Sequence, residues 1–448
     1  MKKNLLILQK LILIILIGGN INLLAQEKLL KSGPMLTWST MKEVGIWVQT
    51  SENAEVYGEY WDIDDQNTVF KTKKKKTKEK NANAVLLIAD QLEPGHKYKY
   101  KLFINDKKVE RPYPTIFQSQ NIWKWRTDAP DFSFLTGSCA YINEEKYDRP
   151  GEPYGGAYQI FESMNQTQAD FMLWLGDNVY LREADWNSET GILHRFSHTR
   201  STNELQALLA SKHQYFIWDD HDYGPNNSDR SYHMKDYTTE VFKEFYPSNN
   251  YIFEEGITSF FQWADCDFFL LDNRSFRTPN KRTDIAQHDI LGQQQIEWLL
   301  DALVNSYASF KFIVVGGQFL SQLETEERFY HYAPQERLQI IEAIKKLQIE
   351  GVVFLTGDVH FSELSKLEIE DAYPLYDFTI SPLTAGPNSN YTDENPLSVE
   401  GSLFKQRNFA KIEVVGPKKG RKLKLSLFNS DGDFLWNYEI LSSELKFK

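Results

Sequence analysis

Three carboxylates and one histidine stand side by side directly after a short apolar segment. The segment YFIW, residues 215–218, predicts a buried strand, and the chain continues with Asp219, Asp220, His221 and Asp222. Neighbouring carboxylates repel one another, and partial burial raises their pKa values unless a cation is present. These residues therefore indicate a cation site at the point where the strand emerges.

Other apolar segments are followed by residues of the same kind. Asp177 follows FMLWL-Gly and Asp358 follows VVFLT-Gly. The polar side chains at the predicted strand ends are, in chain order, Cys139, Asp177, Tyr180, Asp219, Asp220, His221, Gln318, Asp358 and His360. In open α/β sheets ligands bind outside the carboxyl ends of the strands, so we expect these side chains on one rim.

Each of these residues has a simpler interpretation when taken alone. Asp177 could be a helix cap, because Asp is a common capping and turn residue. His360 alone could be a hydrogen-bonded loop histidine. The recurrence of Gly-Asp followed by a further ligand type favours a multinuclear metal site instead, and Asp358 and His360, two residues apart, face the same side in extended geometry.

The elements that would position this rim begin near residue 131. From there, apolar strands alternate with segments of helical periodicity, which predicts βαβ units and a largely parallel sheet. In the last of these helices, Leu338, Ile341, Ile344 and Leu347 mark the predicted apolar face. After residue 370 only strands are predicted, which indicates a second, partly antiparallel layer.

Residues 33–128 predict a separate, small β domain. Short aromatic and β-branched segments alternate with polar turns, and a Leu-Glu-Pro-Gly turn precedes the strand KYKYKLFI. That corner is similar to those of fibronectin type III or immunoglobulin-like sandwiches. The lysine-rich segment 71–80 is either an anion-binding patch or a solvated hairpin tip, and its lack of interleaved aromatic residues favours the second.

The N-terminus has the layout of a secretory signal peptide. Lysines precede the apolar segment 11–17, and Ala25 offers a cleavage site, so we expect residues 1–25 to be removed on export to the periplasm or the exterior. The apolar segment is too short to span a bilayer, and no other segment predicts stable membrane insertion. The net charge of −12 argues against a nucleic-acid partner, which would need a basic footprint.

The two cysteines, Cys139 and Cys266, pose a choice between a disulfide and a thiol with its own role. Cys139 ends a predicted strand, whereas Cys266 begins one. If those strands run parallel, a six-residue strand of about 20 Å separates the two residues, while a disulfide needs Cα atoms within about 7 Å. This geometry favours Cys139 as a metal-binding thiolate.

Six ordered motifs carry a resemblance to a known family. The motifs are LGDNVY, WDDHDYGPNNSD, LDNRSFR, LGQQQIEWL, LTGDVHFSEL and YDFTISPLT. Together they resemble the PhoD-like alkaline phosphatases, a branch of the calcineurin-like metallophosphoesterases, over roughly residues 33–440. The resemblance implies an α/β fold for the catalytic domain, residues 131–448: a sandwich of two mixed β-sheets flanked by helices and preceded by the small β domain.

The resemblance also implies a site with a ferric ion and one or two calcium ions, although other divalent metals are possible. It assigns Asp177 as a bridging ligand, His221 as the catalytic histidine, and Gln318 to a position where many relatives carry a ligating histidine. The implied metal ligands are Cys139, Asp177, Tyr180, Asp220, Asp358 and His360. Carboxylates suit calcium, and thiolate and phenolate suit a ferric or other transition-metal ion.

One feature departs from the family. Its members are often exported folded through a twin-arginine signal, whereas this N-terminus carries lysines and no Arg-Arg pair. We therefore expect export of the unfolded chain, followed by metal capture outside.

These residues predict hydrolysis of small phosphate esters by in-line attack of a metal-bound hydroxide. His221 is expected to protonate the leaving alkoxide or to orient the phosphate. Arg274 is a candidate phosphate clamp, because guanidinium matches phosphate geometry, and a structural salt bridge is the alternative. Two other functions remain open: a phosphodiesterase or phospholipase of the same fold, and a non-catalytic secreted binding protein.

Overall fold

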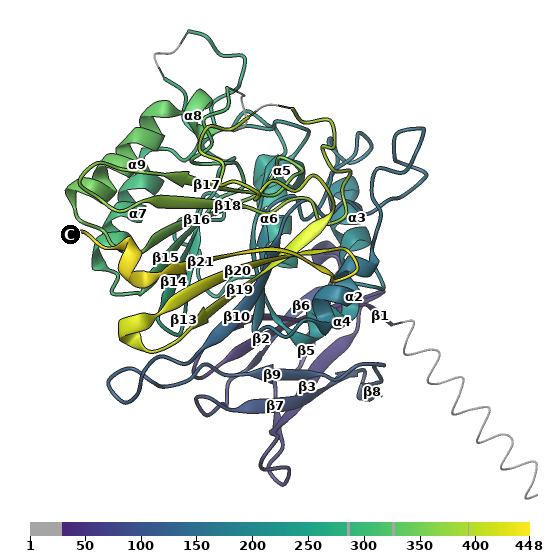
Figure 1. The fold of residues 1–448 in the computed structure, drawn as a ribbon. Helices are drawn as coiled ribbons and strands as arrows, with labels where there is room; N and C mark the ends of the chain where they lie inside the picture. The colour runs from purple at the N-terminus through teal and green to yellow at the C-terminus, as the bar shows by residue number, and fades with distance from the viewer. Residues whose placement is uncertain (1–28, 285–286, 325–327, 393) are drawn as a thin grey trace, which may run out of the picture.

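The computed structural model describes residues 29–284, 287–324, 328–392 and 394–448 (Figure 1). The predicted signal peptide lies outside these residues. Two six-stranded mixed sheets form the larger part of the molecule. The first has the order β12-β11-β10-β19-β20-β21. Its strands are β10 (Phe132–Gly137), β11 (Phe171–Leu175), β12 (His213–Ile217), β19 (Asn408–Val415), β20 (Lys422–Asn429) and β21 (Phe434–Leu441).

The second sheet has the order β13-β14-β15-β16-β18-β17. Its strands are β13 (Ser259–Trp263), β14 (Cys266–Leu270), β15 (Phe310–Val314), β16 (Val352–Thr356), β17 (Glu363–Leu367) and β18 (Leu375–Thr379). In both sheets the strands that lead to the predicted site run parallel. Antiparallel strands complete one side of the first sheet and both edges of the second. The continuous apolar runs of the parallel strands are explained by burial on both faces.

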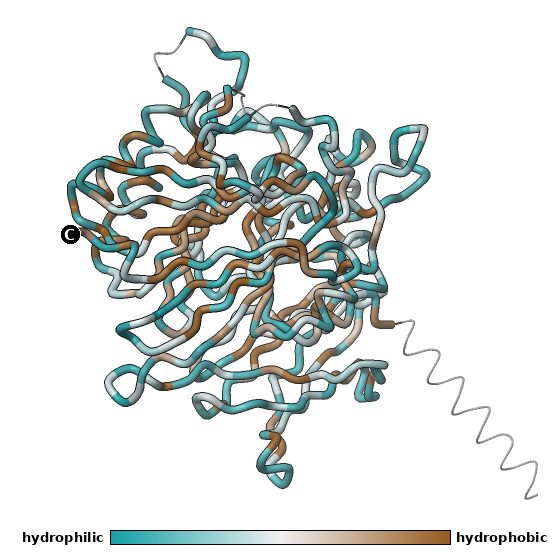
Figure 2. Tube along the Cα trace, in the orientation of Figure 1, coloured by the Kyte–Doolittle hydropathy of each residue, from teal (hydrophilic) through white to brown (hydrophobic). Residues whose placement is uncertain are grey.

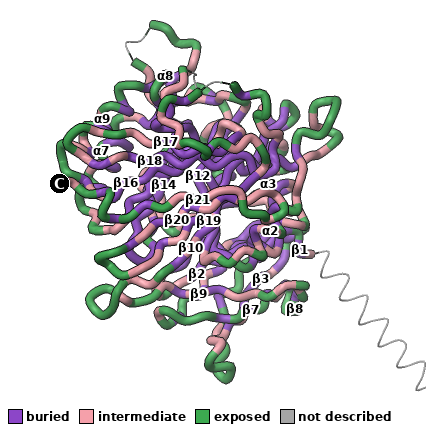
Figure 3. The backbone as a smooth tube through the Cα atoms, in the orientation of Figure 1, coloured by how far each residue is buried: buried purple, intermediate pink, exposed green. Residues whose placement is uncertain are grey.

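Aromatic side chains join the two sheets into one core. Phe134 of β10 meets Phe268 and Phe312 of the second sheet edge-on, with ring centroids 5.4 and 5.7 Å apart, and Phe171 meets Phe268 at 5.6 Å. Hydrophobic residues accordingly follow the central strands in Figure 2, and the same strands are buried in Figure 3. The predicted sandwich of two mixed sheets is confirmed.

Helices flank the sandwich on both sides (Figure 1). They are α2 (Gln159–Gln166), α3 (Glu189–Arg200), α4 (Gln206–Ser211), α5 (Asp220–Tyr223), α6 (Lys235–Phe245), α7 (Gln293–Asn305), α8 (Phe329–Tyr332) and α9 (Pro334–Lys346). The predicted apolar face of α9 was partly wrong, since Leu338 is exposed and Ile340 is buried beside Ile341 and Ile344. The stripe that meets the core is shifted, and it includes the stem of Arg337.

The N-terminal part consists of two smaller sheets. One has β1 (Leu30–Ser39), β2 (Val44–Thr50) and β6 (Ala84–Ala89), and the other has β3 (Glu55–Asp62), β4 (Phe70–Lys71), β5 (Lys75–Lys76), β7 (Lys97–Ile104), β8 (Lys107–Val109) and β9 (Ile116–Gln118). Tyr98 accepts a hydrogen bond at its hydroxyl from the backbone N–H of Glu93, 2.7 Å away, which is a tyrosine corner like that of immunoglobulin-type sandwiches.

The lysine-rich segment 71–80 is not a hairpin tip. It contributes the short strands β4 and β5, which both pair with β3, and the buried Thr72 and Thr77 anchor it. Its lysine side chains are exposed, which agrees with the favoured interpretation of a solvated segment.

The N-terminal sheets pack directly on β12. Trp47 belongs to the same hydrophobic cluster as the strands of the two large sheets, and its indole donates to the carbonyl of Glu244 in α6 at 2.8 Å. The hydroxyl of Tyr215 accepts from the backbone of Ser39, and His213 contacts the carbonyl of Thr37 at 3.0 Å. This contact links the N-terminal part to a strand that leads to the predicted site.

Candidate metal centre

Four residues of the predicted site hold an unusual backbone conformation. Cys139, Asp177, Asp358 and His360 have φ values of 63°, 52°, 72° and 60°, in the left-handed region that non-glycine residues rarely occupy. Each follows the carboxyl end of β10, β11 or β16. Such a conformation costs about 1–3 kcal/mol per residue and persists where the surrounding structure enforces it, typically at functional sites.

The first cluster of ligand atoms contains Cys139, Asp177 and His360, whose donor atoms lie within 4.8 Å of one another. Cys139 Sγ is 3.6 Å from Asp177 Oδ2, and Tyr180 Oη is 3.2 Å from His360 Nε2. His360 Nδ1 donates to the carbonyl of Gly386 at 2.7 Å, so the lone pair of Nε2 faces the cluster. A thiol, a phenol, an imidazole and a carboxyl group therefore converge.

Two further clusters lie next to the first. One contains Asp177, Asp220 and His221, and the other contains Asp219, Asp220 and Asp358, again within 4.8 Å. Because Asp177 and Asp220 each belong to two clusters, the clusters form a continuous series. The second half of the series offers mostly carboxylate oxygens, which suit a hard cation. The residues present therefore fit adjacent metal ions of different preference.

The pKa values of the residues in the clusters also favour a bound cation. Burial, followed by repulsion from Asp220 and Asp219, holds the pKa of Asp177 well above its usual range. Burial, followed by Asp177 and Asp358, likewise raises the pKa of the Cys139 thiol. A cation at this position would reverse both effects, because it favours the deprotonated thiol and carboxyl.

His360 and Asp220 differ in the charge that they carry at pH 7. Burial lowers the pKa of His360 to about 4, so the ring is neutral at pH 7, as a metal ligand must be. Burial also opposes ionisation of Asp220, but His221 and Arg274 outweigh it and lower its pKa to about 2.

Arg274 does not line the pocket beside the clusters. Its guanidinium is buried and forms an ion pair with Asp219, with Nη2 3.8 Å from Asp220 Oδ1. The salt-bridge alternative fits this geometry better than a phosphate clamp does. Gln318 is fully buried and outside the clusters: its Nε2 donates to Thr379 Oγ1 at 3.0 Å, and its Oε1 accepts from Arg328 Nε at 2.7 Å.

Asp222 has a role that the sequence did not assign. One carboxylate oxygen accepts from the backbone of Val179, and the other accepts from the backbone of Asp219, each at 3.0 Å. It thereby ties the loop after β11 to the loop after β12, and burial raises its pKa to about 8. The sequence shows that Asp222 belongs to the DDHD motif. It does not show that the side chain points inward, because that direction depends on the turn of α5.

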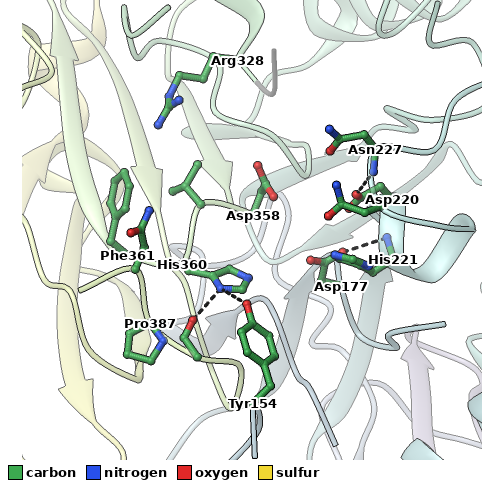
Figure 4. Close-up of a pocket in the computed structure, with 14 residues that line it drawn as sticks. Tyr154, Asp177, Asp220, His221, Asn227, Arg328, Asp358, His360, Phe361 and Pro387 are labelled. Atoms are coloured by element: carbon green, nitrogen blue, oxygen red, sulfur yellow. Dashed lines mark hydrogen bonds between the residues drawn. The ribbon is translucent and has the colours of Figure 1, made fainter. Parts of the chain in front are cut away.

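The clusters border a pocket of about 520 Å³ (Figure 4). Its lining comprises Tyr154, Asp177, Asp220, His221, Asn226, Asn227, Arg328, Asp358, Val359, His360, Phe361, Gly386, Pro387 and Asn388. Tyr154 approaches His360, with Oη 2.9 Å from Nδ1, and the N–H of Asn227 donates to Asp220. Sequence reasoning missed Tyr154, Asn227 and Arg328, because none of them follows a strand.

The two cysteines form no disulfide. Cys139 and Cys266 are both buried free thiols; Cys139 follows β10 of the first sheet, and Cys266 begins β14 of the second. Among the described residues, no helix combines the length and the apolar composition needed to cross a bilayer.

Comparisons with known proteins agree with this geometry. Residues 134–415 match the PhoD-like phosphatase family, and residues 27–122 match a domain family of unknown function, DUF7800. Alkaline phosphatase D of Bacillus subtilis is 23% identical over an alignment of 339 residues, and the match covers 64% of this chain and 55% of that protein. The match thus spans about half the length of that relative.

Solved structures share the fold. The structure of PhoD has a TM-score of 0.73 at 18% identity, covering 92% of this chain and 90% of its own. A purple acid phosphatase, PPD1 from yellow lupin seeds, has a TM-score of 0.68 at 12% identity, covering 91% and 74%. Because the family match covers more than half of the chain and agrees with the clusters described above, this chain belongs to the PhoD-like phosphatase family.

Proposed function

We propose that the protein is an exported, metal-dependent hydrolase of phosphate esters. The observation that carries the proposal is the series of three ligand clusters, linked through Asp177 and Asp220, beside a pocket of about 520 Å³. Adjacent metal positions suit displacement at phosphorus, and a pocket of this volume takes a small organic ester. Membership of the PhoD-like family supports the same reaction class.

The chemistry of the donors supports the assignment of metals. Cys139, Tyr180 and His360, with Asp177, would hold ferric iron, while Asp220 and Asp358 would hold calcium and share Asp177. When bound, the metal ions lower the pKa of the attacking water and neutralise charge on the phosphoryl oxygens.

His221 is the proposed general acid, which protonates the leaving oxygen. It lines the pocket, its ring nitrogen lies within 4.8 Å of the Asp177 and Asp220 oxygens, and its ring packs on Tyr180 with centroids 4.3 Å apart. Its backbone N–H donates to Asp177 at 3.3 Å, so the metal ligand and the acid are held together.

The same proposal covers the organisation of the chain. Residues 1–25 would be a signal peptide, residues 33–128 the small β domain, and residues 131–448 the catalytic domain. Mass spectrometry of the secreted protein tests the first assignment, because the mature chain should begin after Ala25.

Turnover of a monoester and a diester, with and without a chelator, tests the function. We expect hydrolysis of p-nitrophenyl phosphate that EGTA abolishes and calcium restores. Faster turnover of bis(p-nitrophenyl) phosphate would make the protein a diesterase. Full activity after exhaustive chelation, with no metal by elemental analysis, would contradict the metal-dependent mechanism. Bound metal without turnover of either ester would favour a binding protein.

A further inference from the structure

Arg328 carries the permanent positive charge of the pocket lining, on one side of the pocket. Half of its ten polar lining residues are aspartates or histidines, and Arg328 is the one arginine or lysine among the fourteen described residues that line it. In Figure 4 the guanidinium of Arg328 is directed into the pocket, across from His221 and with Asp358 between the two. A substrate anion at the ligand clusters would therefore lie between carboxylate-bound cations and a guanidinium.

The side chain of Arg328 is held by a buried chain of hydrogen bonds. Its Nε donates to Gln318 Oε1 at 2.7 Å, and Gln318 Nε2 donates to Thr379 Oγ1 at 3.0 Å. Thr379 Oγ1 lies 2.9 Å from Thr356 Oγ1, which in turn donates to Asp377 Oδ1 at 2.7 Å. Because Gln318, Thr379, Thr356 and Asp377 are fully buried, the amide of Gln318 has one orientation available.

This arrangement gives Gln318 a purpose other than metal binding. Its carbonyl oxygen accepts from a guanidinium and its amide nitrogen donates to a hydroxyl, so neither atom is directed to the clusters. Arg274 cannot serve in place of Arg328, because it is committed to Asp219 beneath the site and does not line the pocket.

We propose that Arg328 binds a non-bridging oxygen of the substrate phosphoryl group, and that Gln318 is the positioning residue that aims it. The inference rests on the proposed phosphate-ester hydrolysis and specifies its substrate contact. A guanidinium matches the geometry of phosphate oxygens, and Arg328 is only 5% exposed, so its attraction to an anion is little screened by water.

Phosphate binding tests this inference separately from turnover. Isothermal titration calorimetry of the metal-loaded full chain measures the Kd for inorganic phosphate, and the inhibition constant against p-nitrophenyl phosphate provides a second value. Arg328→Met should weaken both by about tenfold to a hundredfold, as expected for a charge-assisted hydrogen bond. Metal content should not change. Arg328→Lys keeps the positive charge but loses the planar pair of N–H donors, so it should weaken phosphate binding less than Arg328→Met does.

Gln318→Leu should weaken phosphate binding less than Arg328→Met does, because the arginine is misdirected but still present. In the double variant the loss should not exceed that of Arg328→Met alone, since Gln318 acts through the arginine. A merely structural role would instead make the two losses add. Arg126→Met, at an exposed arginine far from the pocket in sequence, is the control and should bind phosphate as the wild type does.

The outcomes distinguish a failure of the role proposed for Arg328 from a failure of the proposed hydrolase function. If both Arg328 variants bind phosphate with wild-type affinity and metal content, this inference is wrong and the hydrolase function stands. If the metal-loaded wild type neither binds phosphate nor hydrolyses an ester, the proposed function is wrong and this inference falls with it. If Arg328→Met does not fold, Arg328→Lys decides on the same measurements.

Discussion

Cys139 Sγ lies 3.6 Å from Asp177 Oδ2, and both residues are buried at the ends of neighbouring parallel strands. The same thiol accepts from the Ser381 hydroxyl at 3.2 Å, so it is fixed against the carboxylate. A soft sulfur and a hard oxygen thus lie beside one another on one side of the proposed metal site.

Cys139→Ser should therefore change the metal content. A ferric ion bound by thiolate or phenolate gives a visible charge-transfer band, which we expect to weaken in Cys139→Ser and in Tyr180→Phe. Absorption spectroscopy with elemental analysis measures both. Cys266→Ser is the matched control, because this second buried cysteine lies at the start of β14, and it should keep the band. An unchanged band in Cys139→Ser would remove the thiol from the ligand set.

Asp177→Asn and Asp358→Asn should lose metal and activity while the fold survives. Asparagine tolerates the left-handed conformation that both residues hold, so the backbone is not newly strained. The asparagine carboxamide lacks the negative charge by which the aspartate would bind the metal ions. Circular dichroism and elemental analysis give the two readouts. A variant with full metal content and wild-type turnover would show that its carboxylate is only a turn residue.

His221→Gln should lower kcat by about 10²–10⁴, the range for loss of a general acid, without removing the metals. The loss should shrink for an ester whose leaving group needs no proton, such as p-nitrophenyl phosphate compared with a simple alkyl phosphate. Measuring both esters separates proton donation from metal binding. Equal losses on the two esters, together with a lower metal content, would make His221 a ligand.

Arg274→Met should destabilise the protein by about 3–5 kcal/mol, because it removes the cation that pairs with the buried Asp219 carboxylate and leaves it the neutral donors of Asn273 and the Asp220 backbone. Adding Asp219→Asn should recover part of that loss. Urea unfolding of the single and double variants gives the coupling energy. If Arg274→Met instead keeps its stability and loses only phosphate affinity, the arginine is a substrate contact after all.

Acid should weaken the contact between the N-terminal sheets and β12. His213 Nδ1 donates to the Thr37 carbonyl, and its Nε2 accepts from the backbone of Gln118 at 3.5 Å, which requires the neutral ring. Burial lowers its pKa to about 4, whereas the unfolded value is about 6.5. The unfolded chain thus binds more protons between these pH values.

The stability contributed by neutral His213 should therefore be complete above pH 6.5 and fall as the pH drops towards 4, by up to about 3 kcal/mol. Thermal melts at pH 5 and pH 7 measure this change. His213→Gln should flatten the pH dependence, and His331→Gln, at an exposed histidine outside this contact, is the control. An unchanged slope in His213→Gln would place the acid sensitivity elsewhere.

The sequence predicted those features that depend on local pattern. Continuous apolar runs marked the parallel strands, and the ligand residues follow them directly, so one rule about strand ends located Asp177, Asp358 and Cys139. Arg328 was not predicted, because its place in the pocket lining depends on tertiary contacts such as its hydrogen bond to Gln318, ten residues away in the chain. The sequence also left the role of Arg274 open, since only its burial in the fold distinguishes a structural salt bridge from a substrate contact.

The packing of Trp47 and its neighbours joins the N-terminal part to the larger sheets. Most buried residues of the N-terminal sheets form a core of their own, but Met35, Trp38 and Trp47 belong to the cluster of the two large sheets, so we expect the two parts to stabilise each other. Removing the N-terminal part would expose the apolar surface around Phe245, which Trp47 covers, and would favour aggregation. We therefore expect an insertion to be tolerated at the exposed turns of the small sheets and not within the strands that pack on β12.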